Sequence, residues 1–315
     1  MNTNLFKMIR SLATWMMLAV ISAGMAFGQS APLGSQDNPI KVMLVPTDGG
    51  TDAGTRADFE PVFNAVGRAT DLHFDIRVGQ SYGAVIEGLI NDLVHVAFVG
   101  PVSYLQAKER DSAELLAVSV TNNASVYYAG IFTHADSPIK SLKDLKGKRV
   151  AFGDTSSTSS FTYQVAMMVR EDIDPVRDLA EARLTGSHVN SLMALNEGLV
   201  DAACLSFDSF EKAINNGNVD AGKFRVLVRS DPIPNPPIVM NPRLNPEIKD
   251  KLRKAFGSVH QQPGINPEMI RGYGGKRVDR YDTEFTEEQF SVAAQALALV
   301  TDEIKREMVR KAASR

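Results

Sequence analysis

Six consecutive hydroxyl side chains occupy positions 155–160, within the stretch GDTSSTSSFTYQ. An apolar segment with helical spacing follows directly, and no lysine or arginine lies within the stretch. This pattern is compatible with a solvated surface loop, a helix cap, a nucleophile site or a seat for an anion. A helix N-terminus carries unpaired N–H groups and a partial positive charge. Hydroxyl donors at Ser157, Thr158 and Ser159 would therefore suit a phosphorus or sulfur oxyanion.

Other chemistries have weaker support in the sequence. The hydroxyl run lacks the Gly-Lys-Ser/Thr ending of a phosphate-binding P-loop. The five histidines are scattered without the spacing of metal ligands, so we expect no metal and no cofactor. A Ser–His–Asp triad could be assembled from Ser157, His188 and Asp208, which leaves an exported hydrolase as an alternative. A chain of this length offers many such triples, so the support from this one is weak.

The composition is that of a globular protein with a substantial core. Of the 315 residues, 44% are hydrophobic and 23% are charged. The net charge of −3, without a basic stripe, argues against nucleic acid as a partner. The only cysteine, Cys204, lies in the apolar stretch VDAACLSF, so we expect a buried thiol and no disulfide within the chain.

The N-terminus has the pattern of a secretory signal peptide. Lys7 and Arg10 precede an uncharged apolar run over residues 11–26, and small residues follow it. We predict a signal peptide over residues 1–28, with cleavage after Gly28 or Ala31, and hence a periplasmic protein. A single-pass membrane anchor is the competing interpretation, but the run is short for a membrane span.

Strand and helix patterns alternate along the rest of the chain. Buried-strand runs at residues 40–46, 72–79 and 94–101 are separated by segments with helical spacing. The alternation starts again with a strand at 126–134. The proline-rich stretch DPIPNPPIVM, at 231–240, then leads into a helical tail. Two such blocks predict an α/β fold with a doubled architecture.

We therefore expect a two-lobed type II periplasmic binding protein fold, with a hinge and a ligand cleft between the lobes. The first lobe is predicted to be discontinuous, over 38–125 plus 230–315, and the second lobe to span 126–229. Ligands of such folds lie at the carboxyl ends of strands.

Four further polar side chains are expected at such positions, namely Tyr82, Tyr127, His188 and Asp208. Tyr127 and Tyr128 are neighbours on one strand, so only one of them can face the cleft. Simpler structural roles compete for two of the four. His188 begins a predicted helix and could be a surface or capping residue, and Asp208 could be the N-cap of the helix that follows its strand.

Several stretches together resemble one known family. They are SYGAVIEGL, VHVAFVGPVSYLQA, SPIKSLKDLKGKRVAFGDTSSTSSF, SHVNSLMALNEGLVDAA and IPNPPIVM. In this order they resemble the phosphonate-, phosphite- and phosphate-binding proteins of ABC importers, the PhnD-like group, over about residues 40–260. The most specific part is GDTSSTS, which is similar to the family's GDPxSTSG.

The resemblance implies a ligand site and a role in transport. It implies that the hydroxyls of the Ser-Thr-Ser triplet donate to the ligand, together with the other residues that match the family's site. These positions are Ser157, Thr158, Ser159, Tyr82, Tyr127, His188 and Asp208. It also implies a small oxyanion ligand, a membrane permease as partner and no enzymatic activity. We expect a monomer; a periplasmic sensor for a membrane kinase and a binding protein for another small anion are the alternatives.

The sequence departs from the family pattern at several positions. Pro236 stands where the family often has an aspartate, and His95 stands where an aspartate is common. A carboxylate in such a site accepts a hydrogen bond from a protonated ligand oxygen or pairs with an ammonium group of the ligand. With Pro236 present, only Asp208 is left for that role. We therefore expect phosphite, phosphate or a simple alkylphosphonate rather than an aminophosphonate.

Overall fold

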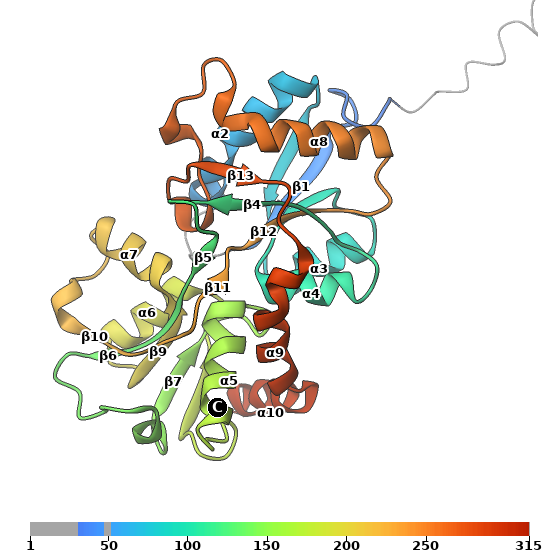
Figure 1. Ribbon diagram of the computed structural model, residues 1–315. Helices are drawn as coiled ribbons and strands as arrows, with labels where there is room; N and C mark the ends of the chain where they lie inside the picture. Colours follow the sequence, from blue (N-terminus) through green and yellow to red (C-terminus); the bar gives the residue numbers. More distant parts are fainter. Residues whose placement is uncertain (1–30, 47–51, 315) are drawn as a thin grey trace, which may run out of the picture.

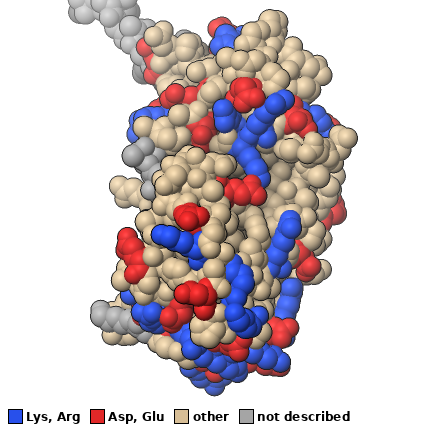
Figure 2. All heavy atoms as spheres, turned by 90° about the vertical axis from the view of Figure 1, so that its left-hand side faces the viewer, with Lys and Arg blue, Asp and Glu red and all other residues tan. Residues whose placement is uncertain are grey.

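The computed structural model describes residues 31–46 and 52–314, so the predicted signal peptide at 1–28 lies outside the described residues. Two mixed α/β units, joined by two crossing strands, make up the described chain (Figure 1). No helix in these ranges is long and apolar enough to span a membrane. Acidic and basic side chains are interspersed on the face shown in Figure 2. Cys204 is buried and unpaired, as predicted.

The first lobe is built on a six-stranded sheet with the order β13-β4-β12-β3-β1-β2. β1 pairs in parallel with β2 and β3, whereas β12 runs antiparallel to β3 and β4. The strands are β1 (Ile40–Leu44), β2 (Phe74–Val78), β3 (Val96–Phe98), β4 (Glu114–Val120), β12 (Pro237–Met240) and β13 (Arg280–Asp282). The main helices of this lobe are α2 (Asp52–Thr70), α3 (Tyr82–Ile90), α4 (Pro101–Lys108) and α8 (Pro246–Ser258).

The second lobe is built on a five-stranded sheet with the order β10-β6-β9-β7-β8. Its strands are β6 (Ala129–His134), β7 (Arg149–Phe152), β8 (Glu181–Leu184), β9 (Ala202–Ser206) and β10 (Phe224–Arg229). Its helices are α5 (Tyr163–Arg170), α6 (His188–Asn196) and α7 (Phe207–Asn215). β7 pairs in parallel with β8 and β9, so the carboxyl ends of these three strands lie at one edge of the sheet.

Two short strands carry the chain between the lobes. β5 (Val126–Tyr127) and β11 (Ile233–Pro234) pair antiparallel, with Tyr127 opposite Ile233. They lie between the two sheets in Figure 1. Because each sheet is complete without them, this narrow two-stranded ribbon is the natural hinge of the molecule.

The C-terminal helices α9 (Ser291–Leu299) and α10 (Asp302–Ala313) lie against the second lobe (Figure 1). α9 packs on α5 and also on α4, and α10 packs on β8. The ammonium group of Lys311 donates to the carbonyls of Val176 and Leu179. The predicted lobe boundaries, 38–125 plus 230–315 and 126–229, stay a prediction; the contacts place α10 on a strand of the second sheet and α9 between α4 and α5. A helical pattern predicts an amphipathic face without saying which sheet covers it.

Candidate functional site

The hydroxyl run lies on a tight turn between β7 and α5. Gly153 begins the turn, and a Cβ atom at this position would lie 2.1 Å from Oγ of Ser160. Only glycine permits this close approach. Ser157 then caps a π-helical turn, Thr158–Thr162, which leads into α5. Such turns recur at functional sites because they aim side chains differently from an α-helix.

Six of the seven predicted site residues line one enclosed cavity between the lobes. Each of the six side chains is almost fully buried, since none exceeds 5% exposure. The six are Tyr82, Tyr127, Ser157, Thr158, Ser159 and His188. Val45, Phe98, Gly100, Pro236 and Tyr273 complete the wall. The free space at its centre is about 10 Å³, roughly what one water molecule requires.

Four helical segments begin at this cavity. α3 begins at Tyr82, α4 follows Gly100, the π-helical turn follows Ser157, and α6 begins at His188. Their N-terminal partial positive charges therefore converge on it. None of the described lining residues is a lysine, arginine, aspartate or glutamate. The cavity thus favours an anion through dipoles and neutral donors, without a fixed counter-charge.

The hydroxyls of Ser157 and Thr158 are set up to donate. Ser157 Oγ accepts from the backbone N–H of Ser160, at 3.2 Å, and from its hydroxyl, at 2.7 Å. Thr158 Oγ1 accepts from the backbone N–H of Val102, at 2.9 Å. A hydroxyl has one hydrogen to donate and two lone pairs to accept with. Ser157 Oγ accepts two bonds and Thr158 Oγ1 accepts one, and each hydroxyl keeps its hydrogen to offer a ligand oxygen.

Tyr127 is a protonated donor at neutral pH. Its burial and the neighbouring Tyr273 raise the pKa of the phenol well above its ordinary value, although a hydrogen bond with Ser159 lowers it. Tyr128, the next residue, instead lies under the guanidinium of Arg229, with the ring centroid 3.6 Å from its central carbon. The two tyrosines therefore have the different surroundings expected for neighbours on a strand.

His188 is a neutral imidazole with a fixed orientation. Its Nδ1 accepts from the backbone N–H of Ser206, at 3.0 Å. An Nδ1 that accepts this bond carries no hydrogen, so the hydrogen is on Nε2. Nε2 lies 3.0 Å from the hydroxyl of Tyr273. The bond to Tyr273 therefore holds His188 in its position in the cavity wall.

Asp208 does not line the cavity. Its carboxylate accepts from Nζ of Lys276, at 2.7 Å, and Glu211 contacts the same ammonium group at 2.9 Å. Burial raises the pKa of Asp208, and Lys276 opposes this shift. The N-cap of α7 is Ser206, so the capping role considered for Asp208 belongs to Ser206. Direct contact between Asp208 and a ligand stays a prediction that this pairing does not favour.

Three hydrogen bonds join the hydroxyl turn to the first lobe beside the cavity. The backbone N–H of Tyr82 donates to the carboxylate of Asp154, at 3.3 Å. Thr158 Oγ1 accepts from the N–H of Val102, and Ser103 donates to the carbonyl of Ser156, at 2.9 Å. In each case one partner comes from a helix start of the first lobe and the other from the hydroxyl turn. The site is therefore assembled from groups of both lobes.

Tyr273 is a lining residue with a polar group that the sequence did not predict. It lies in a short turn of the first lobe, in which Gly274 and Gly275 both have φ of 69°. Its ring contacts Tyr127, with centroids 5.3 Å apart, and Phe98, with centroids 6.4 Å apart. An aromatic residue within the sequence GYGGK, in an otherwise polar stretch, was the available signal.

A protein-family comparison matches residues 50–282, most of the chain. The matching family is described as the periplasmic substrate-binding protein of the phosphonate ABC transporter. The chain belongs to this family. Its members are substrate-binding components of ABC transporters and not enzymes.

Two characterised relatives and one solved structure are similar to this family member. The phosphate-import protein PhnD of Mycolicibacterium smegmatis is 27% identical over 79% of this chain and 81% of its own length. The phosphonates-binding periplasmic protein of Escherichia coli is also 27% identical, over 58% of this chain and 55% of its own length. A binding protein of a phosphonate ABC transporter from Pseudomonas aeruginosa has the same fold, with a TM-score of 0.72, 22% identity and coverage of 88% and 90%. The two-lobed fold is thereby confirmed.

The geometry of this binding protein gives no support to a serine hydrolase. His188 is bonded through both ring nitrogens to Ser206 and Tyr273, and Asp208 is paired with Lys276. The stretch GQSYG at 79–83 has the GxSxG spacing of a nucleophile elbow, which requires a strained turn. Ser81 instead has an extended backbone, with φ of −155°, and caps α3. Within the described ranges, no cluster of His, Cys, Asp and Glu side chains could hold a metal ion.

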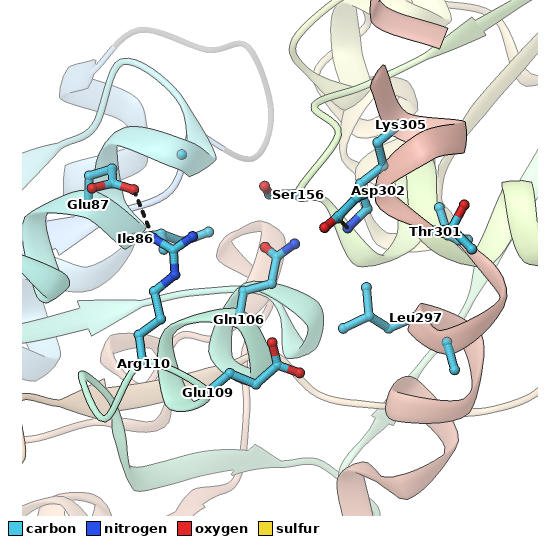
Figure 3. Close-up of a pocket in the computed structure, with 13 residues that line it drawn as sticks. Ile86, Glu87, Gln106, Glu109, Arg110, Ser156, Leu297, Thr301, Asp302 and Lys305 are labelled. Carbon is cyan, nitrogen blue, oxygen red and sulfur yellow. Dashed lines mark hydrogen bonds and ion pairs between the residues drawn. The ribbon is translucent and has the colours of Figure 1, made fainter. Parts of the chain in front are cut away.

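A larger groove of about 550 Å³ lies next to the hydroxyl turn. Side chains of α3 and α4 line one side, and the junction between α9 and α10 lines the other (Figure 3). Its two basic side chains both have acidic partners, since Arg110 contacts Glu87 at 3.4 Å and Lys305 contacts Asp302 at 3.8 Å. The groove therefore lacks the convergent donors of the enclosed cavity, which remains the better candidate site.

Proposed function

We propose that this chain captures a compact phosphorus oxyanion, such as phosphate, phosphite or a small alkylphosphonate, and delivers it to a membrane permease. The observation that carries the proposal is the convergence of four helix N-termini and neutral hydroxyl donors on one buried cavity. A tetrahedral oxyanion needs several donors at once, and this arrangement supplies them from both lobes.

The character of the cavity supports a ligand without an ammonium group. Pro236 lines the wall where a carboxylate is frequent in the family, and Asp208 is engaged by Lys276. A buried ammonium without a carboxylate partner carries a large desolvation cost. The two relatives, named as a phosphate-import protein and a phosphonates-binding protein, support the same ligand class.

The proposed cellular role begins with export. We propose that residues 1–28 are removed as a signal peptide and that the mature protein acts in the periplasm as a monomer. Closure of the lobes around the ligand is then the signal that a permease reads. Mass spectrometry of the exported protein should give a mature N-terminus near Gly28 or Ala31; an intact N-terminus in the membrane fraction would indicate an anchor.

The ligand test is a calorimetric titration of the purified mature protein with phosphate, phosphite, methylphosphonate, sulfate and 2-aminoethylphosphonate. We expect submillimolar binding of at least one of the first three ligands, with weaker binding of the last two. Failure of all phosphorus oxyanions to bind would overturn the proposed ligand class. Uptake of the bound ligand, lost on deletion of the chain and restored by complementation, would separate transport from a sensing role.

A further inference from the structure

One short turn of the first lobe engages the second lobe at two of the predicted ligand residues. This segment, Gly272–Lys276, is called the GYGGK turn below. The hydroxyl of Tyr273 lies 3.0 Å from Nε2 of His188 and 3.0 Å from Oγ of Ser206. Three residues later, Nζ of Lys276 lies 2.7 Å from the carboxylate of Asp208. The turn therefore engages one residue of the cavity wall, His188, and one further predicted ligand residue, Asp208.

The GYGGK turn has a defined shape and is held from within the first lobe. The N–H of Gly272 donates to the carbonyl of Lys276, at 2.8 Å, and Arg271 donates to the carbonyl of Gly275, at 2.9 Å. Gly275 has positive φ, and a Cβ atom there would lie 2.4 Å from the carboxylate of Asp58. Asp58 in turn pairs with Lys212 of the second lobe, at 3.0 Å. The position of Tyr273 is thus set by several contacts besides its own.

Tyr273 also takes up space at the cavity. Its side chain is 7% exposed and forms part of the wall, between Tyr127 and Phe98. The free space left is about 10 Å³, so Tyr273 bounds a narrow part of the site. A larger ligand would have to displace Tyr273 and break its bonds to His188 and Ser206. The loss of these bonds would weaken the binding of larger ligands.

We propose that the GYGGK turn determines specificity: Tyr273 limits the size of the ligand substituent, and Lys276 withdraws Asp208 from the site. The site then accepts an oxyanion whose fourth substituent is an oxygen, a hydrogen or a methyl group, and it rejects aminoalkylphosphonates. An aminoalkyl chain needs volume and a carboxylate for its ammonium group. Here the volume is filled by a ring, and the carboxylate of Asp208 already has a cationic partner.

The inference rests on the proposed function and is tested by ratios of dissociation constants. The ligands are phosphite, methylphosphonate, n-propylphosphonate and 2-aminoethylphosphonate, measured by calorimetry on the mature protein. We expect Tyr273→Ala to shift the ratio of propylphosphonate to phosphite affinity toward propylphosphonate by about 10- to 100-fold, the range for a few methylenes gaining space. Tyr273→Phe keeps the ring and should leave this ratio unchanged.

Lys276 is tested in the enlarged site. In the Tyr273→Ala background, adding Lys276→Met should improve binding of 2-aminoethylphosphonate relative to propylphosphonate by about tenfold, because Asp208 becomes available to the ammonium group. Arg277→Met, the neighbouring surface cation, should not change this ratio. If the protein binds phosphite but neither ratio shifts, the inference is overturned. The proposed function would then remain intact.

Two outcomes do not depend on the folding of the Tyr273→Ala variant. Binding of 2-aminoethylphosphonate by the wild-type protein as tightly as phosphite would overturn the inference even if Tyr273→Ala failed to fold. Tyr273→Leu, a milder truncation, should then show a smaller shift in the same direction. If the wild-type protein binds no phosphorus oxyanion at all, the proposed function itself fails, so the two failures are distinguishable.

Discussion

The hydroxyl of Tyr273 lies 3.0 Å from Nε2 of His188, although 85 residues separate them and they belong to different lobes. This bond joins the two lobes, and it fixes the hydrogen-bonding state of a residue in the cavity wall. Closure and the chemistry of the site are therefore coupled through one phenol. If the ligand stabilises the closed form, loss of this bond will lower the affinity for the ligand.

Tyr273→Phe should weaken binding of all ligands by a similar factor of about 3 to 10. The variant keeps the ring but leaves Nε2 of His188 and the Ser206 hydroxyl without this partner, and one buried hydrogen bond contributes about 0.5–1.5 kcal/mol. Calorimetric titration with phosphite and methylphosphonate measures the effect. Tyr104→Phe, which removes the bond to Glu287 away from the cavity, is the control. A loss restricted to one ligand would contradict the coupling.

Ser157→Ala should lower affinity for an oxyanion by about tenfold or more. Ser157 is positioned to donate because it already accepts two bonds, and a hydrogen bond to a charged group contributes about 1.5–3 kcal/mol. Ser258→Ala, on α8, removes a hydroxyl remote from the cavity and should leave affinity unchanged. Equal affinity of Ser157→Ala and wild type would remove Ser157 from the ligand site.

Gly153→Ala should disrupt the hydroxyl turn. The new methyl group would lie 2.1 Å from Oγ and 2.8 Å from Cβ of Ser160, so the turn must move. We expect a loss of about 1–3 kcal/mol in the free energy of unfolding, measured with urea, and loss of oxyanion binding. Gly222→Ala, whose methyl group would have ordinary contacts, is the matched control. A variant that binds as wild type would show that the turn tolerates displacement.

Asp154 should make stability fall as the pH rises. Burial raises the pKa of its carboxyl above the ordinary value, although the N–H groups of Ser156 and Tyr82 lower it. The native state therefore holds the proton more tightly than the unfolded chain. This contribution is fully present below about pH 3.9, the ordinary value, and is lost as the pH rises through the native pKa.

Asp154→Asn removes this titration. The difference in unfolding free energy between wild type and the variant should become less favourable to wild type from about pH 4 upward, until the native carboxyl is fully ionised. Urea unfolding at several pH values measures it, with the surface substitution Asp37→Asn as control. A difference that does not change with pH would show that Asp154 titrates as it does in the unfolded chain.

The sequence alone predicts those site residues whose position follows from the succession of a strand, a loop and a helix. A strand that ends in Gly153, followed by hydroxyls and a helix, places Ser157, Thr158 and Ser159 at a sheet edge by connectivity alone. Tyr82 and His188 follow from the same rule, since each begins a helix after a strand. The two-lobed fold likewise follows from the repeated alternation of strands and helices.

The remaining parts depend on contacts between distant segments. Tyr273 reaches the cavity because a glycine-rich turn of the first lobe docks on the second, and Lys276 pairs with Asp208 for the same reason. Periodicity carries no information on such docking. The placement of α10 on β8 is a further case, because an amphipathic helix can cover either sheet.

The two ends of the described chain belong to different lobes. β1 lies in the sheet of the first lobe, whereas α10 is anchored on β8 of the second. Fluorophores attached near Leu33 and Ser314 would therefore change their separation whenever the lobes move. We expect energy transfer between fluorophores at the two ends to change when a ligand binds between the lobes.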